Sequence, residues 1–239
     1  MNETKTILVT GSSSGLGLAI ANFFLKKNQT VFGLARRETP LESPLFKGLS
    51  VDLTQYGQVE ELFRNQLSSI KELDTLYLNA GDLGPIESLR GISGQQLKET
   101  FEINFFSQFF FMQQIFKNSI SVKSVVAISS GAARKGSPGW GAYNTSKAAF
   151  LMMISVLAKE NPETHFLSLA PGLVDSEMQK KVRAGNVSQF PNLQRFFDAY
   201  ETKTLTPASA VIEKFWENRE FFQQLDSGSF YDLRDLKSN

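Results

Sequence analysis

The chain carries, near its start, the stretch Lys5-Thr6-Ile7-Leu8-Val9-Thr10-Gly11-Ser12-Ser13-Ser14-Gly15-Leu16-Gly17. Its first half is an apolar run rich in β-branched residues, which predicts a buried strand. Apolar residues then recur at helical spacing up to Lys26 and Lys27, which predicts a helix with cations at its negative end. A strand, a Gly-rich turn and a helix together favour binding of a dinucleotide, because glycines admit a pyrophosphate and the helix start offers free N–H groups. A plain strand-to-helix turn is the alternative.

The next predicted strand, residues 30–35, leads directly into Arg36 and Arg37. An acidic residue about 20 positions past the glycines would accept hydrogen bonds from the ribose of NAD. Two guanidinium groups suit a 2′-phosphate instead, so this charge pattern favours NADP. The alternative is a solvated basic turn in which Glu38 contacts the ribose of NAD.

A second motif lies far downstream, where Ser130 follows a predicted buried strand and Tyr143 and Lys147 start the next helix. Ser130 stands at the carboxyl end of its strand, where ligands bind in open α/β sheets. Tyr143 and Lys147 are four residues apart and share one helix face. Separately, each of the three residues is more often structural than functional; their order after the Gly-rich turn favours a joint site.

These three side chains suit the reduction of a carbonyl group. The carbonyl oxygen gains negative charge when a hydride arrives, so it must be stabilised and protonated. A phenol with a pKa of about 10 releases its proton too reluctantly for this exchange, and a nearby ammonium would lower that pKa. A serine hydroxyl can donate a hydrogen bond to the developing oxyanion.

On these motifs the chain is identified as a member of the short-chain dehydrogenase/reductase family over nearly its whole length. The spacing of thirteen from Ser130 to Tyr143 matches the family and selects Ser130 over Ser129. The other matching elements are Thr10 to Gly17 (T-G-x-x-x-G-x-G), Asn79-Ala80-Gly81, Asn104, Asp52-Leu53, and Pro171 to Met178, in which Ser176 replaces a threonine. Within the family the chain resembles sepiapterin and benzil reductases, partly through Ser229 to Leu236.

The resemblance implies a role for each matching residue. Tyr143 would be the general acid/base, Ser130 would position the substrate oxygen, Lys147 would bind the nicotinamide ribose, and Asn104 would hold a water that relays protons. The implied contacts of NADP(H) are Gly11, Ser12, Ser13, Ser14, Gly15, Leu16, Gly17, Arg36, Arg37, Asp52, Leu53, Asn79, Ala80, Gly81, Tyr143, Lys147, Pro171, Gly172, Val174 and Ser176.

Composition excludes several other classes of protein. The formal net charge of +1 gives no electrostatic reason to expect nucleic acid or an anionic membrane as a partner. The chain has no cysteine and one histidine, His165, so we expect no metal site and a structural role for that histidine. The absence of cysteine, of a membrane-length apolar run and of a signal peptide predicts a cytoplasmic protein.

Strand and helix patterns alternate along all 239 residues. Alternation of this kind predicts one Rossmann-type domain over residues 1–239, with a doubly wound parallel sheet of about seven strands and helices on both faces. Further strands are expected near 47–51, 73–79, 122–129, 164–170 and 228–232, and helices near 55–70, 93–117, 141–160 and 206–217. The long stretch 173–206 is interpreted as a substrate lid, or else as an ordinary helical excursion packed on the sheet.

The helices predicted at 93–117 and 141–160 are apolar nearly all round, which implies burial on every side. We expect them to form the interface of a homodimer or homotetramer; a thick monomeric core is the alternative. The substrate pocket should lie between the loops 130–143 and 82–94 and the stretch 173–206. Trp140 and Phe190 are expected there either as apolar walls or as packing residues.

The sequence therefore predicts an NADPH-dependent carbonyl reductase acting on a small ketone or aldehyde. Two other functions stay open. One is a non-catalytic NADP sensor or scaffold on the same fold, since a fold alone does not establish an activity. The other is epimerisation or dehydration of a sugar nucleotide, which also uses Tyr and Lys, although no large substrate domain is apparent.

Overall fold

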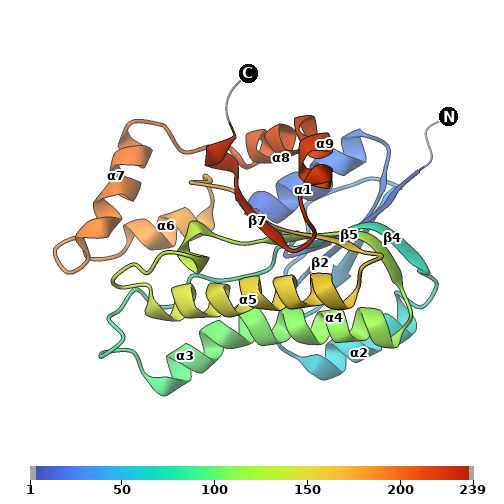
Figure 1. Cartoon of the computed structure of the whole chain (residues 1–239), viewed down its shortest axis with the longest axis horizontal. Coiled ribbons are helices and arrows are strands. Elements are labelled where there is room, and N and C mark those ends of the chain that lie inside the picture. Colours follow the sequence, from blue (N-terminus) through green and yellow to red (C-terminus); the bar gives the residue numbers. More distant parts are fainter. Residues whose placement is uncertain (1–3, 237–239) are drawn as a thin grey trace.

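The computed structural model describes residues 4–236, in which seven parallel strands form one sheet (Figure 1). The strand order is β3-β2-β1-β4-β5-β6-β7, so the chain starts in the middle of the sheet and winds outward in both directions. This order confirms the predicted doubly wound fold. The strands are β1 (Thr6–Thr10), β2 (Thr30–Ala35), β3 (Phe46–Ser50), β4 (Glu72–Leu78), β5 (Ser121–Ile128), β6 (His165–Ala170) and β7 (Ser229–Asp232).

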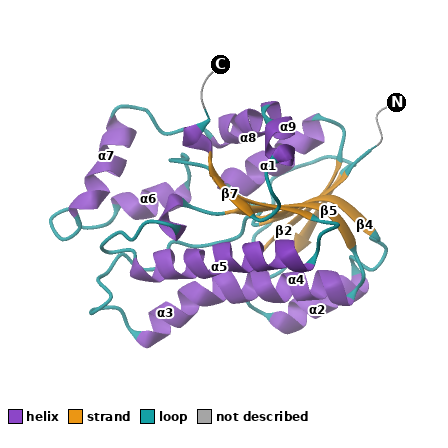
Figure 2. Cartoon of the chain, in the orientation of Figure 1, coloured by secondary structure: helices purple, strands orange, loops and turns teal. Residues whose placement is uncertain are grey.

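Helices cover both faces of the sheet (Figure 2). One face carries α1 (Gly15–Lys26), α8 (Ala208–Glu217) and α9 (Arg219–Gln224), and the other carries α2 (Tyr56–Asn65), α4 (Ser107–Lys117) and α5 (Gly141–Glu160). Neighbouring residues of β1 show why its pattern is apolar throughout: Ile7 and Leu8 are both buried, in the clusters on opposite faces. Successive side chains of a strand point to opposite sides, so a sheet covered twice needs apolar residues at every position.

The helix expected over 93–117 is present but interrupted. Ser93 caps α3 (Gly94–Phe101) through a reciprocal pair of hydrogen bonds with Gln96. A π-helical turn, Glu102–Phe106, then joins α3 to α4 and holds the buried Asn104. Such turns are rare and frequently occur at functional sites, and no apolar periodicity marks them in a sequence.

One other predicted helix boundary is wrong, and one helix was not predicted. The helix expected to reach residue 70 ends at Asn65, because Gln66 and Leu67 both donate their backbone N–H to the Leu62 carbonyl and the chain turns. Leu67 is fully buried in the core beneath α2, so packing continues past the end of the helix. The sequence also gave no sign of α9, a separate short helix after Asn218.

The stretch 173–206 contains α6 (Glu177–Arg183), a short 3₁₀ turn at Pro191–Leu193 and α7 (Gln194–Glu201), beyond the carboxyl ends of the strands (Figure 1, left). It packs into an apolar cluster that includes Trp140, Tyr143, Val182, Phe190 and Phe196. Within residues 4–236, no helix has the length and apolar character needed to cross a bilayer, and no cluster of three or more His, Asp or Glu side chains could hold a metal ion.

Candidate active site

The candidate site begins where the strand order reverses. β1 pairs with both β2 and β4, and the chain leaves β1 and β4 in opposite directions. Ligands of open α/β sheets bind in the crevice at such a point. Asn79 spans it: its Nδ2 donates to the backbone carbonyls of Thr10 at 2.9 Å and Gly11 at 3.3 Å. Thr10 Oγ1 in turn accepts hydrogen bonds from the backbone N–H groups of Asn79 and Ala80, at 2.9 and 3.0 Å.

The Gly-rich turn is built to leave the start of α1 open. Gly11 and Gly15 have φ values of +71° and +56°, in the left-handed region that favours glycine. A Cβ at Gly17 would lie 2.2 Å from the Gly11 carbonyl oxygen, so no side chain fits there. Ser14 precedes α1 without capping it through its side chain, and the first turn holds no acidic residue. Uncapped N–H groups at a helix start suit a phosphate, so these residues fit a dinucleotide.

The residues expected near the adenosine end surround this turn. Arg36, Arg37 and Glu38 are all exposed, and Arg37 Nη2 donates to Ser14 Oγ at 3.2 Å. The buried Ser12 hydroxyl instead bonds to Thr39 Oγ1 at 2.8 Å, so it supports the turn itself.

The pair Asp52-Leu53 follows β3, and its two side chains have different surroundings. Asp52 Oδ1 accepts hydrogen bonds from the backbone and hydroxyl of Thr54, at 3.0 and 2.8 Å, while the side chain remains half-buried. Leu53 is buried in the core beneath α2.

The structure brings Ser130, Tyr143 and Lys147 together. Ser130 follows β5, and its hydroxyl accepts a hydrogen bond from the Ala132 N–H at 3.1 Å. The buried Lys147 extends from α5 to the end of β5, where its Nζ donates to the Ile128 carbonyl at 3.0 Å. Tyr143 is also buried, and its hydroxyl lies 4.0 Å from the Sδ of Met178.

Burial controls the protonation of both Tyr143 and Lys147. It raises the pKa of Tyr143 to about 12; the Ser130 hydroxyl lowers that pKa and the charge of Asp82 raises it, both by less. Burial also lowers the pKa of Lys147 to about 8. The expectation that Lys147 brings the Tyr143 pKa below 10 is therefore wrong for this structure, because loss of hydration outweighs every neighbouring charge. At neutral pH Tyr143 is protonated and Lys147 is mainly charged.

Asn104 lies at the centre of a buried hydrogen-bond network. Its Nδ2 donates to the Asp82 carbonyl at 2.8 Å and to Ser146 Oγ at 3.0 Å, and its Oδ1 accepts from the Asp82 N–H at 2.8 Å. Ser146 Oγ donates to the Tyr143 carbonyl at 3.0 Å. Sequence reasoning singled out neither Asp82 nor Ser146 as a site residue, because neither belongs to a recognisable spacing.

The segment Pro171 to Met178 runs from β6 into α6. Gly172 has a φ of +84°, and Ser176 precedes the helix with its hydroxyl donating to the Val174 carbonyl at 3.3 Å. Val174 pairs with Thr206 across the two ends of the stretch 173–206. This pairing holds the two ends of the stretch 173–206 together.

The three segments expected around a substrate contact one another near Tyr143. Glu87 pairs with Trp140, and Lys181 of α6 forms an ion pair with Asp82 at 2.7 and 3.0 Å. The Phe190 ring packs on Gly139, where a Cβ would lie only 2.7 Å from the ring. Trp140 and Phe190 are both buried in the same apolar cluster, and Trp140 Nε1 is buried without a hydrogen-bond partner among the described residues.

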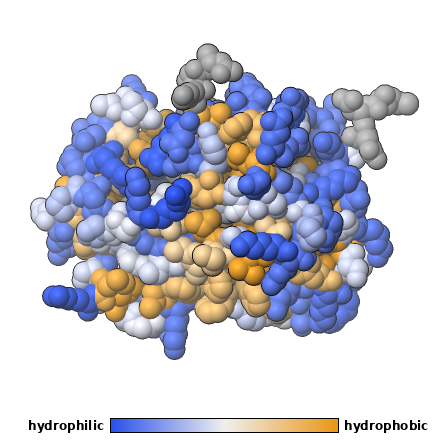
Figure 3. Space-filling view, in the orientation of Figure 1, coloured by the Kyte–Doolittle hydropathy of each residue, from blue (hydrophilic) through white to orange (hydrophobic). Residues whose placement is uncertain are grey.

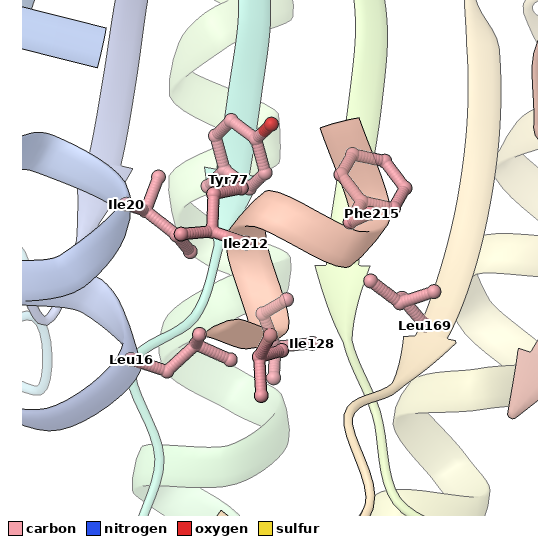
Figure 4. A pocket seen from close by; sticks show the side chains of 8 residues that line it. Leu16, Ile20, Tyr77, Ile128, Leu169, Ile212 and Phe215 are labelled. Atoms are coloured by element: carbon pink, nitrogen blue, oxygen red, sulfur yellow. The ribbon is translucent and has the colours of Figure 1, made fainter. Parts of the chain in front are cut away.

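Two hollows among the described residues lie away from Ser130, Tyr143 and Lys147. One is a void of about 10 Å³ between α1, α8 and the sheet, lined by Leu16, Tyr77, Phe215 and other core residues (Figure 4). It has room for about one water at most. The other is an open groove of about 320 Å³ on the outer face, between α1, α8 and Pro40-Leu41.

A doubly wound sheet with a Gly-rich turn at its reversal point and a Ser-Tyr-Lys set at the same edge defines a Rossmann-type oxidoreductase. The family model described as short chain dehydrogenase matches residues 5–187. The chain therefore belongs to the short-chain dehydrogenase family, whose members use NAD(P)(H).

Relatives with assigned activities match over nearly the whole chain. A benzil reductase ((S)-benzoin forming) of Bacillus cereus is 32% identical over 92% of this chain and 96% of its own. Its counterpart in Bacillus subtilis (strain 168) is 30% identical over 96% and 98%. The predicted resemblance to benzil reductases is thus confirmed.

Solved structures agree with the fold. The crystal structure of the KRED1-Pglu enzyme superposes with a TM-score of 0.83 at 27% identity, covering 95% of this chain and all of that one. A short-chain dehydrogenase/reductase from Saccharomyces cerevisiae gives a TM-score of 0.81 at 28% identity, covering 97% and 96%.

Proposed function

We propose that the protein is an NADPH-dependent reductase of ketones and aldehydes, with vicinal diketones such as benzil as its first candidate substrates. The observation that carries this proposal is the convergence of Ser130, Tyr143 and Lys147 at the carboxyl ends of the strands, at the same edge of the sheet as the open start of α1. Similarity to two benzil reductases supports the choice of diketone. An NADPH-dependent reductase of Ornithobacterium rhinotracheale, 28% identical over 88% of this chain, supports the choice of NADPH.

Tyr143 supplies the proton in this proposal. A bound NADPH would supply the hydride to the carbonyl carbon. Tyr143 is protonated at neutral pH and donates its proton to the carbonyl oxygen as negative charge develops there. Because burial raises the pKa of Tyr143 and so makes it a weaker acid, this transfer depends on a neighbouring positive charge. The Ser130 hydroxyl donates a hydrogen bond to the same oxygen, and the buried ammonium of Lys147 stabilises the phenolate that remains.

The cofactor would lie across the reversal point of the sheet. Backbone N–H groups at the start of α1 would bind the pyrophosphate, and the exposed Arg36 and Arg37 would bind the 2′-phosphate. Asp52 and Leu53 would contact the adenine. Asn79 to Gly81 and the segment Pro171 to Ser176 would flank the nicotinamide half, where Lys147 would bind the ribose. Asn104 would orient a water toward Lys147.

Substrate entry would require movement of the stretch 173–206, which we propose acts as a lid. The Sδ of Met178 on α6 lies 4.0 Å from the Tyr143 hydroxyl, so opening of the stretch would move Met178 away from the proposed acid. The ion pair between Lys181 and Asp82 is exposed and therefore weak, which suits a contact that opens in each turnover.

The protein would act as a homodimer or homotetramer through the helices expected at 93–117 and 141–160. Apolar side chains gather over α4 and α5 in the lower half of the molecule (Figure 3). Those exposed include Phe106, Phe109, Phe116, Met152 and Val156. A cytoplasmic location and the absence of nucleic-acid and membrane partners stay predictions.

A substrate assay tests the proposed activity. Purified protein is given NADPH or NADH with benzil, other vicinal diketones and aldehydes, and oxidation of the cofactor is followed with chiral analysis of the alcohol. We expect turnover with NADPH and a diketone. NADPH binding without oxidation across the whole panel would contradict the reductase and favour a non-catalytic sensor.

A further inference from the structure

The C-terminal motif Ser229 to Leu236 has a place in the fold that the proposed reaction does not yet use. Its first half forms β7, the edge strand beside β6, with Asp232 in register with Ala170. Its second half is a short 3₁₀ turn, Leu233–Asp235. Asp232 therefore stands at the carboxyl end of the sheet, level with the start of the segment Pro171 to Met178.

Asp232 and Arg234 form a two-pronged ion pair. Oδ1 of Asp232 accepts from Nε of Arg234 at 2.9 Å and from the Arg234 backbone N–H at 3.1 Å, while Oδ2 accepts from Nη2 at 2.5 Å. The carboxylate is only 9% exposed. Burial raises the Asp232 pKa, but the hydrogen bonds from Arg234 outweigh burial and hold it below its usual value. The Arg234 side chain is 56% exposed, but its two parallel bonds to the carboxylate orient the plane of the guanidinium.

The arginine oriented in this way lies between two loops of the candidate site. A Cβ at Gly131 would lie 3.3 Å from Arg234 Nη2 and 3.7 Å from Asp232 Oδ2. A Cβ at Gly172 would lie 3.3 and 3.4 Å from Cγ and Cδ of Arg234. The guanidinium thus packs on the residue directly after Ser130, and the arginine stem packs on the loop after β6.

The turn that Arg234 contacts is the one that orients Ser130. The Ser130 hydroxyl accepts a hydrogen bond from the Ala132 N–H across the 3₁₀ turn Gly131–Ala133. A shift of Gly131 would therefore move the Ser130 hydroxyl. Tyr143 and Lys147 belong to a different element, the helix α5. Displacements near 1 Å in a reacting group can cost about 100-fold in rate.

We propose that Arg234, held by Asp232, is a positioning residue that sets the Ser130 turn against the loop after β6 and so places the hydrogen bond from Ser130 to the substrate oxygen. This inference rests on the proposed reductase function. It gives the C-terminal motif a role in turnover although neither side chain is among the proposed contacts of substrate or cofactor.

A double-mutant cycle with Ser130 tests the positioning role. The variants are Arg234→Ala, Asp232→Asn, Ser130→Ala and Ser130→Ala with Arg234→Ala; the control is Arg64→Ala on the exposed side of α2. If Arg234 acts through Ser130, Arg234→Ala lowers kcat by about 30-fold in the wild-type background but by less than about 3-fold once Ser130 is alanine. Asp232→Asn should resemble Arg234→Ala, and Arg64→Ala should resemble wild type.

Losses of equal size in both backgrounds would show a general structural effect, and an unchanged kcat would show no role; either result overturns the inference. Hydrogen exchange of the peptide containing residues 129–136 gives a readout that does not need activity. Faster exchange there in Arg234→Ala, with β1 and α1 unchanged, supports the positioning role, and unchanged exchange opposes it. If wild-type protein reduces no carbonyl, the proposed function fails by itself, and the exchange measurement still decides whether Arg234 holds the Ser130 turn.

Discussion

The Nζ of Lys147 lies 6.0 Å from the centroid of the Tyr143 ring, and both side chains are almost completely enclosed by protein. The four-residue spacing on α5 thus brings the amine near the phenol, as the sequence suggested. Enclosure nevertheless has the larger effect on both groups, raising the Tyr143 pKa to about 12 and lowering the Lys147 pKa to about 8. The proposed acid is accordingly protonated at neutral pH, but it releases that proton less readily than an unperturbed phenol.

Replacing Tyr143 by phenylalanine should remove the proton donor with little change in packing. We expect kcat for diketone reduction to fall by about 100- to 10,000-fold, the usual range for loss of a general acid. The dissociation constant of NADPH, measured by fluorescence titration, should change by less than about 3-fold, since one hydroxyl contributes little to binding of a large cofactor. Tyr200→Phe, at an exposed position of α7, is the matched control. Full activity of Tyr143→Phe would show that the wrong acid has been assigned.

Burial of Lys147 should make stability depend on pH. Its pKa falls from 10.5 to about 8 in the folded protein, so between these values the unfolded chain binds more protons and stability rises with pH. Lys147→Met removes this dependence. The free energy of unfolding of the variant minus that of wild type should therefore be larger at pH 7 than at pH 10, by on the order of 3 kcal/mol.

Urea unfolding at the two pH values measures that difference. Lys159→Met, at an exposed position of the same helix, controls for the loss of a surface charge. The stability difference between Lys147→Met and wild type could instead be the same at pH 7 and pH 10. That result would mean that folding does not lower the pKa of Lys147.

The exposed arginines after β2 should select the cofactor. Arg36→Ala with Arg37→Ala removes two cations from the proposed 2′-phosphate site, and NADPH binding should weaken by about 100-fold while NADH binding changes by less than about 3-fold. Isothermal titration with each cofactor measures both values. Arg64→Ala serves as the control for loss of an exposed arginine away from the proposed site. Equal weakening of NADPH and NADH would refute a contact with the 2′-phosphate.

Gly81 should tolerate no side chain, because of the groups around it. A Cβ there would lie 2.9 Å from Asn104 Oδ1 and 3.4 Å from Lys147 Nζ. Gly81→Ala should therefore displace the Asn104 network and lower kcat by at least about 10-fold. Gly57→Ala on α2 meets no atom within 4 Å and should keep full activity, with stability unchanged or raised by up to about 1 kcal/mol. Equal activity of the two variants would argue against a role for the network in turnover.

The apolar face of α4 and α5 should mediate self-association. Met152 is 64% exposed on this face, so Met152→Glu places a charge where a partner subunit would bury it. Light scattering at micromolar concentration should show a dimer or tetramer for wild type and monomers for the variant. Tyr200→Glu, exposed on α7, should leave the assembly intact. A monomeric wild-type protein would refute the interface.

The sequence by itself determined the order of strands and helices, the open Gly-rich turn and the alignment of Tyr143 with Lys147. Each of these depends on interactions between residues near one another along the chain: alternation along a strand, capping at a helix start and spacing along a helix face. Regular periodicity failed where the backbone departed from it, at the π-helical turn around Asn104 and at the early end of α2.

Only the tertiary structure decided the chemistry around these residues. The raised pKa of Tyr143 results from enclosure by segments distant in sequence, among them Met178 of α6. The bonds from Asn104 to Asp82 and Ser146, and the position of Arg234 beside Gly131, likewise join residues 22, 42 and 103 positions apart. The loss of hydration at Tyr143 and the contacts of Asn104 and Arg234 depend on which distant segments the folded chain brings close. No local sequence pattern specifies those segments.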